Sequence, residues 1–104
     1  MENYKVIFEP RAVNDLNEIV KYIADILKEP EIAKRIYASI KKQISSLDTM
    51  PYRCKLVDDE PFCKMGIRKL PVENYTAFYL VNEESKTVHI FRVLYNRREW
   101  QHLL

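Results

Sequence analysis

Apolar residues fall on every second position near the start of the chain and then recur at helical spacing. In NYKVIF (3–8), Tyr4, Val6 and Phe8 fall on one side, which predicts a first strand. Pro10 suits the first turn of a helix, where its missing N–H costs nothing. The apolar residues that follow predict an amphipathic helix from about 10 to 28 and are Ala12, Leu16, Ile19, Val20, Ile23, Ile26 and Leu27.

A second helix is predicted to begin at Pro30, after the break at KEP (28–30). Its apolar stripe consists of Ile32, Ile36, Ile40, Ile44 and Leu47. Because the linker between the two helices is so short, we expect them to form an antiparallel hairpin.

The second half of the chain predicts strands. DTMPYRCKLVDDEP (48–61) indicates a loop, and three strand-like runs follow: CKMGIRKLPV (63–72), YTAFYLV (75–81) and VHIFRVLY (88–95). Their short connections predict an antiparallel meander. We therefore predict one α+β domain over residues 1–104, in which the N-terminal strand joins a twisted, mainly antiparallel sheet and the helical hairpin packs on one face.

The face of the sheet that the hairpin does not cover, called the open face below, should carry polar side chains. Arg68 and Arg92 lie in the first and last meander strands with apolar neighbours, a pattern that indicates charges presented on the open face. With Tyr95, Arg97 and Arg98 at its rim, this face is predicted to be a cationic, concave surface.

Composition narrows the class of protein only slightly. The 104 residues are 47% hydrophobic and 31% charged, with a net charge of +2, which fits one globular domain and says little about partners. Residues 34–55 carry six bases and one acid, which predicts either a solvated helix face or a surface for phosphate or an acidic protein. No membrane-spanning or signal segment is evident, so we expect a cytoplasmic protein with reduced cysteines and no membrane partner. No spacing of His, Cys and acids suggests a metal, and no cofactor is implied.

Two long stretches resemble the RelE/ParE superfamily, the toxins of type II toxin–antitoxin systems. The first is GIRKLPVENYTAFYLVNEESKTVHIFRVLYNRREW (66–100), with an Arg in the first meander strand, NY opening the next, FY within it and a final RVL strand. The second is YKVIFEPRAVNDLNEIVKYIA (4–24), a strand and helix with the pattern A…DL…I..YI. The resemblance implies a fold like that of the microbial ribonucleases.

The resemblance also implies one of two activities. RelE-like members cut mRNA on the ribosome, whereas ParE-like members inhibit DNA gyrase and have no recognised catalytic residues. Members of both kinds are held inactive by a cognate antitoxin, and operator DNA is bound only through the antitoxin complex. We favour ribosome-dependent mRNA cleavage narrowly over gyrase inhibition. A third interpretation is a partner-binding component of a repressor complex without toxicity of its own.

Metal-free RNA cleavage needs a base for the 2′-hydroxyl, cations for the phosphorane-like transition state and an acid for the leaving 5′-oxygen. By resemblance, Arg68 occupies the strand position of a functional arginine in the ribonuclease members. Tyr95 lies near the position where those members carry a His or Tyr, so Tyr95 is predicted to act as base or acid. The catalytic candidates are Arg68, Arg92, Tyr95 and Arg98, and the candidates for RNA or antitoxin binding are Lys64, Lys69, Arg97 and His102.

These residues also have structural interpretations. Arg68 and Arg92 could pair with Glu73, Glu83 or Glu99 across the sheet. Tyr95 could pack on Trp100 as a rim aromatic. Arg97 and Arg98 could form an exposed turn or bind antitoxin carboxylates.

Overall fold

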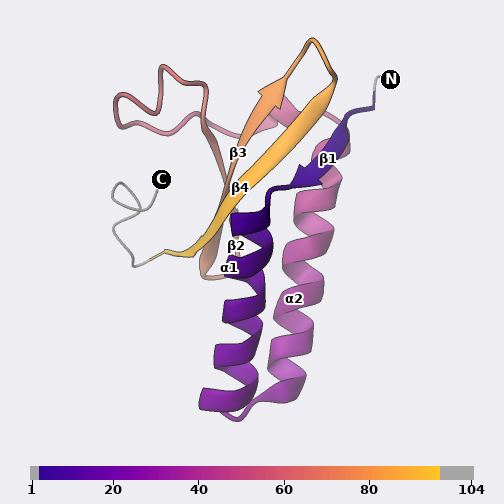
Figure 1. Ribbon diagram of the computed structural model, residues 1–104, viewed down its shortest axis with the longest axis vertical. Helices are drawn as coiled ribbons and strands as arrows, with labels where there is room; N and C mark the ends of the chain where they lie inside the picture. The colour runs from indigo at the N-terminus through magenta and orange to yellow at the C-terminus, as the bar shows by residue number, and fades with distance from the viewer. Residues whose placement is uncertain (1–2, 97–104) are drawn as a thin grey trace.

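The computed structural model describes residues 3–96 and contains the strands and helices in the predicted order (Figure 1). The elements are β1 (Lys5–Phe8), α1 (Pro10–Lys21), the π-helical turn η1 (Tyr22–Ile26), α2 (Pro30–Ser45), the 3₁₀ turns η2 (Ser46–Asp48) and η3 (Pro51–Arg53), β2 (Arg68–Val72), β3 (Tyr75–Asn82) and β4 (Thr87–Tyr95). The two helices lie side by side, and the end of their hairpin projects beyond the strands (Figure 1).

The strands form one sheet in the order β1-β4-β3-β2. β2, β3 and β4 are antiparallel neighbours, and β1 pairs in parallel with the first half of β4, from Lys5 opposite Thr87 to Phe8 opposite Ile90. The predicted α+β fold, with a mainly antiparallel sheet and a helical hairpin on one face, is confirmed.

The first meander strand is shorter than predicted. Residues 63–66 form a turn in which the Gly66 N–H donates to the Cys63 carbonyl at 3.0 Å. Gly66 has φ +83°, in the left-handed region that glycine adopts without strain. The strand therefore begins only at Arg68.

The main core lies between the helical hairpin and one face of the sheet. Tyr79 at the centre of β3 is fully buried, and its hydroxyl donates to the Pro51 carbonyl at 2.7 Å. Around it pack apolar residues of both helices and three strands, including Ala12, Leu16, Ile36, Ile40, Ile44, Leu70, Val72, Ala77, Val88, Ile90 and Val93. The predicted apolar stripes of the two helices supply one side of this core.

The predicted open face is covered over part of its area, so the expectation of a bare face is wrong. A second, smaller core consists of Val57, Ile67, Phe78 and Leu94, with Phe62, Leu80 and Phe91 packed against it. Val57 and Phe62 come from the segment between η3 and β2, which crosses this side of the sheet. The Val57 N–H donates to the Ile67 carbonyl at 2.9 Å, so backbone hydrogen bonds also hold this segment in place. Apolar packing therefore fills part of the face for which a cationic concave surface is predicted, and the predicted rim residues Arg97 and Arg98 lie outside the described residues.

A buried ion pair joins α1 to β4. Arg92 donates from Nε and Nη2 to the two carboxylate oxygens of Asp15, at 2.7 and 3.0 Å, and both residues are only 8% exposed. Asp15 Oδ2 also accepts the backbone N–H of Val93 at 3.0 Å. β1 ends at Phe8, and its next residue, Glu9, makes the last backbone bond to Ile90. The Val93 N–H lies on the edge of β4 beyond the last residue that pairs with β1, and Asp15 accepts its hydrogen bond in place of a neighbouring strand.

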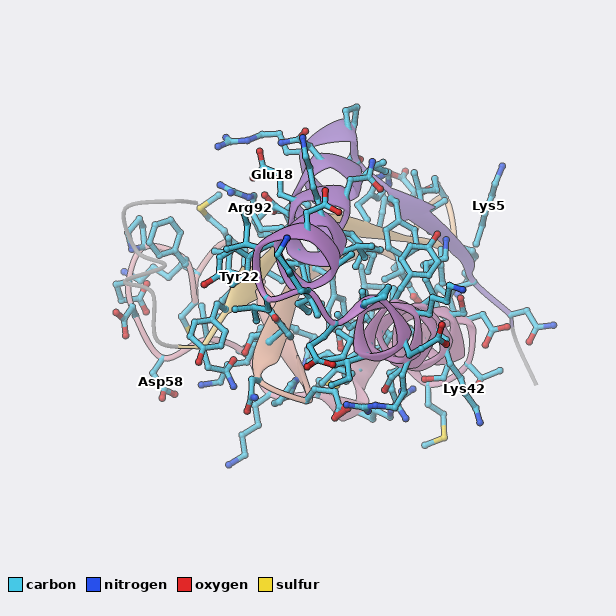
Figure 2. The ribbon with its side chains drawn as sticks, turned by 90° about the horizontal axis from the view of Figure 1, so that it is seen from below. Lys5, Glu18, Tyr22, Lys42, Asp58 and Arg92 are labelled. Carbon is cyan, nitrogen blue, oxygen red and sulfur yellow. The ribbon has the colours of Figure 1, made fainter. Side chains whose placement is uncertain are left out.

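The prediction that Arg92 presents its charge on the open face is wrong, because its guanidinium is buried against the Asp15 carboxylate of α1. Tyr79 pairs with Ile90, whereas the preceding residue of β3, Phe78, pairs with Arg92, which leaves Phe91 as an extra residue. Pairing with Phe78 puts Arg92 in register with the side of the second core, and its long side chain nevertheless reaches Asp15 on α1. Figure 2 shows Arg92 beside the axis of α1.

We predict that Asp15→Ala lowers the free energy of unfolding by about 3–5 kcal/mol, because it leaves the Arg92 charge buried without a partner. The measurement is urea denaturation followed by circular dichroism. Asn17→Ala, two residues further along α1 at an exposed position, is the control and should change stability by less than about 0.5 kcal/mol. An equal, small effect of both substitutions would show that the buried pair contributes little.

Candidate functional site

Arg68 lies on the helix side of the sheet, not on the open face. It pairs across the strands with Tyr79, whose side chain belongs to the main core, and directly paired residues share a face. Its guanidinium donates to the Cys54 carbonyl at 2.7 Å and lies 5.0 Å from the ring centre of Tyr52. Arg68 therefore holds the segment after η3 against the start of β2.

Tyr95 lies at the opposite end of the meander. It pairs with Tyr75, and the two rings meet edge to face with their centres 5.6 Å apart. Since Arg68 pairs with Tyr79 and Tyr95 with Tyr75, four residues separate the two positions along β3, roughly 13 Å. Tyr95 is a rim aromatic, but the partner found among the described residues is Tyr75; the predicted partner, Trp100, lies outside them.

The other candidates do not complete a cluster within residues 3–96. Lys64 is exposed in the turn before β2. Lys69 pairs with Phe78 and so lies on the side of the second core. Arg97, Arg98 and His102 lie outside the described residues. Of the predicted catalytic set, Arg68, Arg92 and Tyr95 are thus described, and each contacts a different part of the protein.

A polar cluster that was not predicted from the sequence lies around Glu83, at the turn between β3 and β4. Its carboxylate accepts hydrogen bonds from Tyr4 at 2.6 Å, Tyr52 at 3.2 Å and Lys86 at 2.8 Å. The hydrogen bonds from Lys86 and Tyr4 lower the pKa of Glu83 below its ordinary value. Because its carboxylate is already hydrogen-bonded to these neighbours, the Glu83 cluster connects Tyr4, just before β1, to the turn between β3 and β4.

A groove of about 790 Å³ lies where the end of the hairpin projects past the strands. Its walls come from α1, η1, the start of α2 and the adjoining ends of β3 and β4. The described residues that line it are Asp15, Glu18, Ile19, Tyr22, Ile23, Leu27, Glu29, Ile32, Ile36, Asn74, Tyr75, Val93, Leu94 and Tyr95. They include three acids and no Lys, Arg or His.

Large apolar side chains gather at the end of the hairpin beside this groove. Tyr22 is 53% exposed, Ile26 67%, Leu27 51% and Ile32 42%. α1 does not continue as an α-helix to residue 28 as predicted but widens into the π-turn η1, closed by a bond from the Leu27 N–H to the Tyr22 carbonyl at 3.1 Å. The wider turn shifts the helical spacing, so Ile26 and Leu27 leave the buried stripe that ends at Ile23.

Two other kinds of site have no support within the described part of the chain. No helix there is both long and apolar enough to cross a membrane. Residues 3–96 also contain no group of three or more His, Cys, Asp or Glu side chains placed to hold a metal ion.

Comparison with known proteins places this fold among the toxins. The family model described as the ParE toxin of the type II toxin–antitoxin system parDE matches residues 6–100. A comparison with curated proteins found no match.

Several solved structures share the fold. A structure of the chromosomal ParDE system of P. aeruginosa has a TM-score of 0.73 at 22% identity and covers 91% of this chain and 98% of that chain. The RelBE2 toxin–antitoxin complex of Mycobacterium tuberculosis gives a TM-score of 0.63 at 24% identity, covering 89% and 98%. A mutant of the E. coli toxin RelE in the free state gives 0.66 at 15% identity, covering 97% and 92%.

These solved structures show a common fold, and the family model spans nearly the whole chain. The chain therefore belongs to the ParE toxin family of type II toxin–antitoxin systems, within the RelE/ParE superfamily.

Proposed function

We propose that this protein is a growth-inhibiting toxin that acts by binding DNA gyrase and does not itself cleave RNA. The family model that matches the chain is that of ParE toxins, and RelE-like structures share the fold at low identity. The choice between the two activities therefore rests on the geometry of the candidate residues.

The observation that carries the proposal is the separation of the candidate catalytic side chains. RNA cleavage requires a base, a cation and an acid within reach of one phosphate. Arg92 is paired with the buried Asp15, Arg68 donates to the Cys54 carbonyl, and Tyr95 packs on Tyr75 some distance away. Each of the three side chains is thus engaged with a different partner, which favours structural roles for them over a shared phosphate site.

The exposed apolar end of the hairpin supports a function in protein binding. Contiguous apolar patches on a small protein commonly mark interaction surfaces. Tyr22, Ile26, Leu27 and Ile32 are close in sequence on η1 and the adjoining ends of the helices, and all are more than two-fifths exposed. We place the gyrase-binding surface on these four residues, which are called the hairpin-end surface below.

An antitoxin is proposed as the second partner. The solved relatives include toxin–antitoxin complexes, among them RelBE2 of Mycobacterium tuberculosis and the archaeal RelE–RelB complex from Pyrococcus horikoshii. By analogy, a cognate antitoxin would hold this toxin inactive in the cytoplasm, and operator DNA would be bound only through that complex.

We predict that the purified protein inhibits supercoiling of relaxed plasmid by DNA gyrase and that Ile26→Asp weakens inhibition by about ten-fold or more. A carboxylate at this exposed position leaves the core unchanged but opposes burial in an apolar interface. Met65→Asp is the matched control, because Met65 is also exposed, at 57%, on the segment before β2. Absence of inhibition by the wild-type protein, or equal inhibition by the two variants, would contradict the proposal.

We also predict that mRNA remains intact when the protein is added to a purified translation system. Primer extension on a translated message is the measurement, with Arg68→Ala and Tyr95→Phe beside the wild type. Discrete cleavages in the translated region that disappear in both variants would establish a ribonuclease and overturn the proposal.

A further inference from the structure

We propose that Thr87 is a nucleophile that takes an acyl group from a small activated ester, with His89 as its base and Glu9 as the residue that positions the imidazole. These three residues are called the Thr87 site below. His89 Nε2 lies 3.0 Å from Thr87 Oγ1, and His89 Nδ1 lies 2.8 Å from Glu9 Oε1. A hydroxyl, an imidazole and a carboxylate joined in this order through the two ring nitrogens form the arrangement that activates hydroxyl nucleophiles on several unrelated folds.

The carboxylate of Glu9 determines the direction of the other hydrogen bonds in the site. An ionised carboxylate accepts hydrogen bonds and cannot donate them, so His89 Nδ1 carries the proton between the two groups. In a neutral imidazole Nε2 is then an acceptor, and Thr87 donates its hydroxyl proton to it. Ser85 Oγ lies 2.7 Å from Thr87 Oγ1 and is the donor in that contact, because the Thr87 proton already points to His89. The Thr87 oxygen therefore faces a base that can remove its proton.

Backbone hydrogen bonds hold the residues of the site in place. Glu9 connects β1 to α1, and its carbonyl accepts the N–H groups of Ala12 and Val13 at 2.9 and 3.1 Å. The Glu9 side chain does not cap α1 and bonds to His89 instead. Thr87 is the first residue of β4, at the point where β1 pairs with it. Because the three side chains come from hydrogen-bonded elements, their geometry is set before a substrate binds.

The Thr87 site is accessible and has apolar neighbours. The side chain of His89 is 35% exposed and that of Glu9 is 41% exposed. His89 pairs with Ile7 of β1 on one side and with Leu80 of β3 on the other. Paired residues share a face of the sheet, so two half-buried apolar side chains flank the imidazole. They offer an apolar surface to an acyl chain, which favours an ester of an apolar acid.

The site is near the start of α1, whereas the hairpin-end surface is beyond the other end of that helix (Figure 1). The acyl-transfer chemistry therefore uses a part of the protein separate from the surface proposed to contact gyrase.

The reaction has two steps, with water as the second reactant. In the first, Thr87 Oγ1 bonds to the ester carbonyl carbon while His89 Nε2 takes its proton, and the carboxylate of Glu9 stabilises the imidazolium. The bond to the leaving oxygen then breaks, and that oxygen takes the proton from Nε2. In the second step His89 takes a proton from water, the resulting hydroxide attacks the acyl carbon, and Thr87 Oγ1 leaves with the proton. Lys5 pairs with Thr87 on the same face and adds positive charge near the developing oxyanion.

The test measures hydrolysis of p-nitrophenyl butyrate by the full chain, with release of p-nitrophenolate as the readout. Thr87→Val and His89→Gln should each lower kcat by about 100-fold, the scale of a lost acid–base group. Valine has the β-branched shape of threonine, so the first variant keeps the strand. Glu9→Gln should lower kcat by about ten-fold or more and leave KM unchanged, because Glu9 acts on the imidazole and not on the ester. Acid quenching followed by peptide mass spectrometry should locate the butyryl group on Thr87.

Thr49→Val is the matched control, because Thr49 is also half-buried and lies after η2, outside the Thr87 site. It should hydrolyse the ester at the wild-type rate, and Thr87→Ser, which keeps a hydroxyl, should be faster than Thr87→Val. The inference is overturned if wild type is no faster than Thr87→Val, if Thr49→Val slows the reaction equally, or if the butyryl group is found on Lys or Cys side chains and not on Thr87. An unchanged kcat in Glu9→Gln would exclude the positioning role of Glu9.

Discussion

The buried carboxylate of Asp15 connects the helical layer of this fold to the sheet by hydrogen bonds. It lies on α1, accepts two hydrogen bonds from Arg92 and one from the Val93 backbone, and is almost fully buried. The four-residue strand β1 leaves the second half of β4 with an unpaired edge, and buried backbone donors without partners are costly. By meeting this requirement from the helix, Asp15 fixes α1 against the end of β4. The groove, which is bounded by both elements, inherits its shape from that contact.

The same contact changes the chemistry available to Arg92. A guanidinium whose Nε and Nη2 are bound to a buried carboxylate presents few donors to a phosphate. Breaking the pair would leave a buried charge without a partner. Other basic groups predicted to form a phosphate-binding surface are committed in a similar way. Arg53 donates to the Ser46 and Thr49 carbonyls, and Arg35 pairs with Glu73. The cluster of positive charge in residues 34–55 is therefore partly used to hold the loop after α2 and the turn between β2 and β3.

The elements of the fold could be predicted because each is local and strongly periodic. The apolar stripe from Ile32 to Leu47 follows α2 and the turn after it. The first meander run contains β2, and the other two match β3 and β4 to within one residue. The placement of each arginine side chain could not be predicted, because it depends on contacts with residues distant in sequence. Arg68 shares a face with Leu70 and Val72, whereas the prediction relied on its apolar neighbours in sequence. Arg92 pairs with Phe78 of the second core, but its guanidinium is bound by Asp15, 77 residues away in sequence, a contact that no local pattern marks.

The groove could not be predicted for a related reason, because its lining residues come from segments distant in sequence. The charged residues that line it are all acidic, so charge is unevenly distributed over the surface. Its carboxylates come from the N-terminal third, where acids outnumber bases, while its aromatic side chains come from both helical and strand segments distant in sequence. A near-neutral net charge conceals this separation. A phosphate backbone brought to the groove would face the carboxylates of Glu18 and Glu29, and the exposed surface beside the groove is apolar. The side of the molecule that exposes Ile26 and Leu27 thus also presents the carboxylates of Glu18 and Glu29, which is the physical basis for favouring protein partners over nucleic acid at the end of the hairpin.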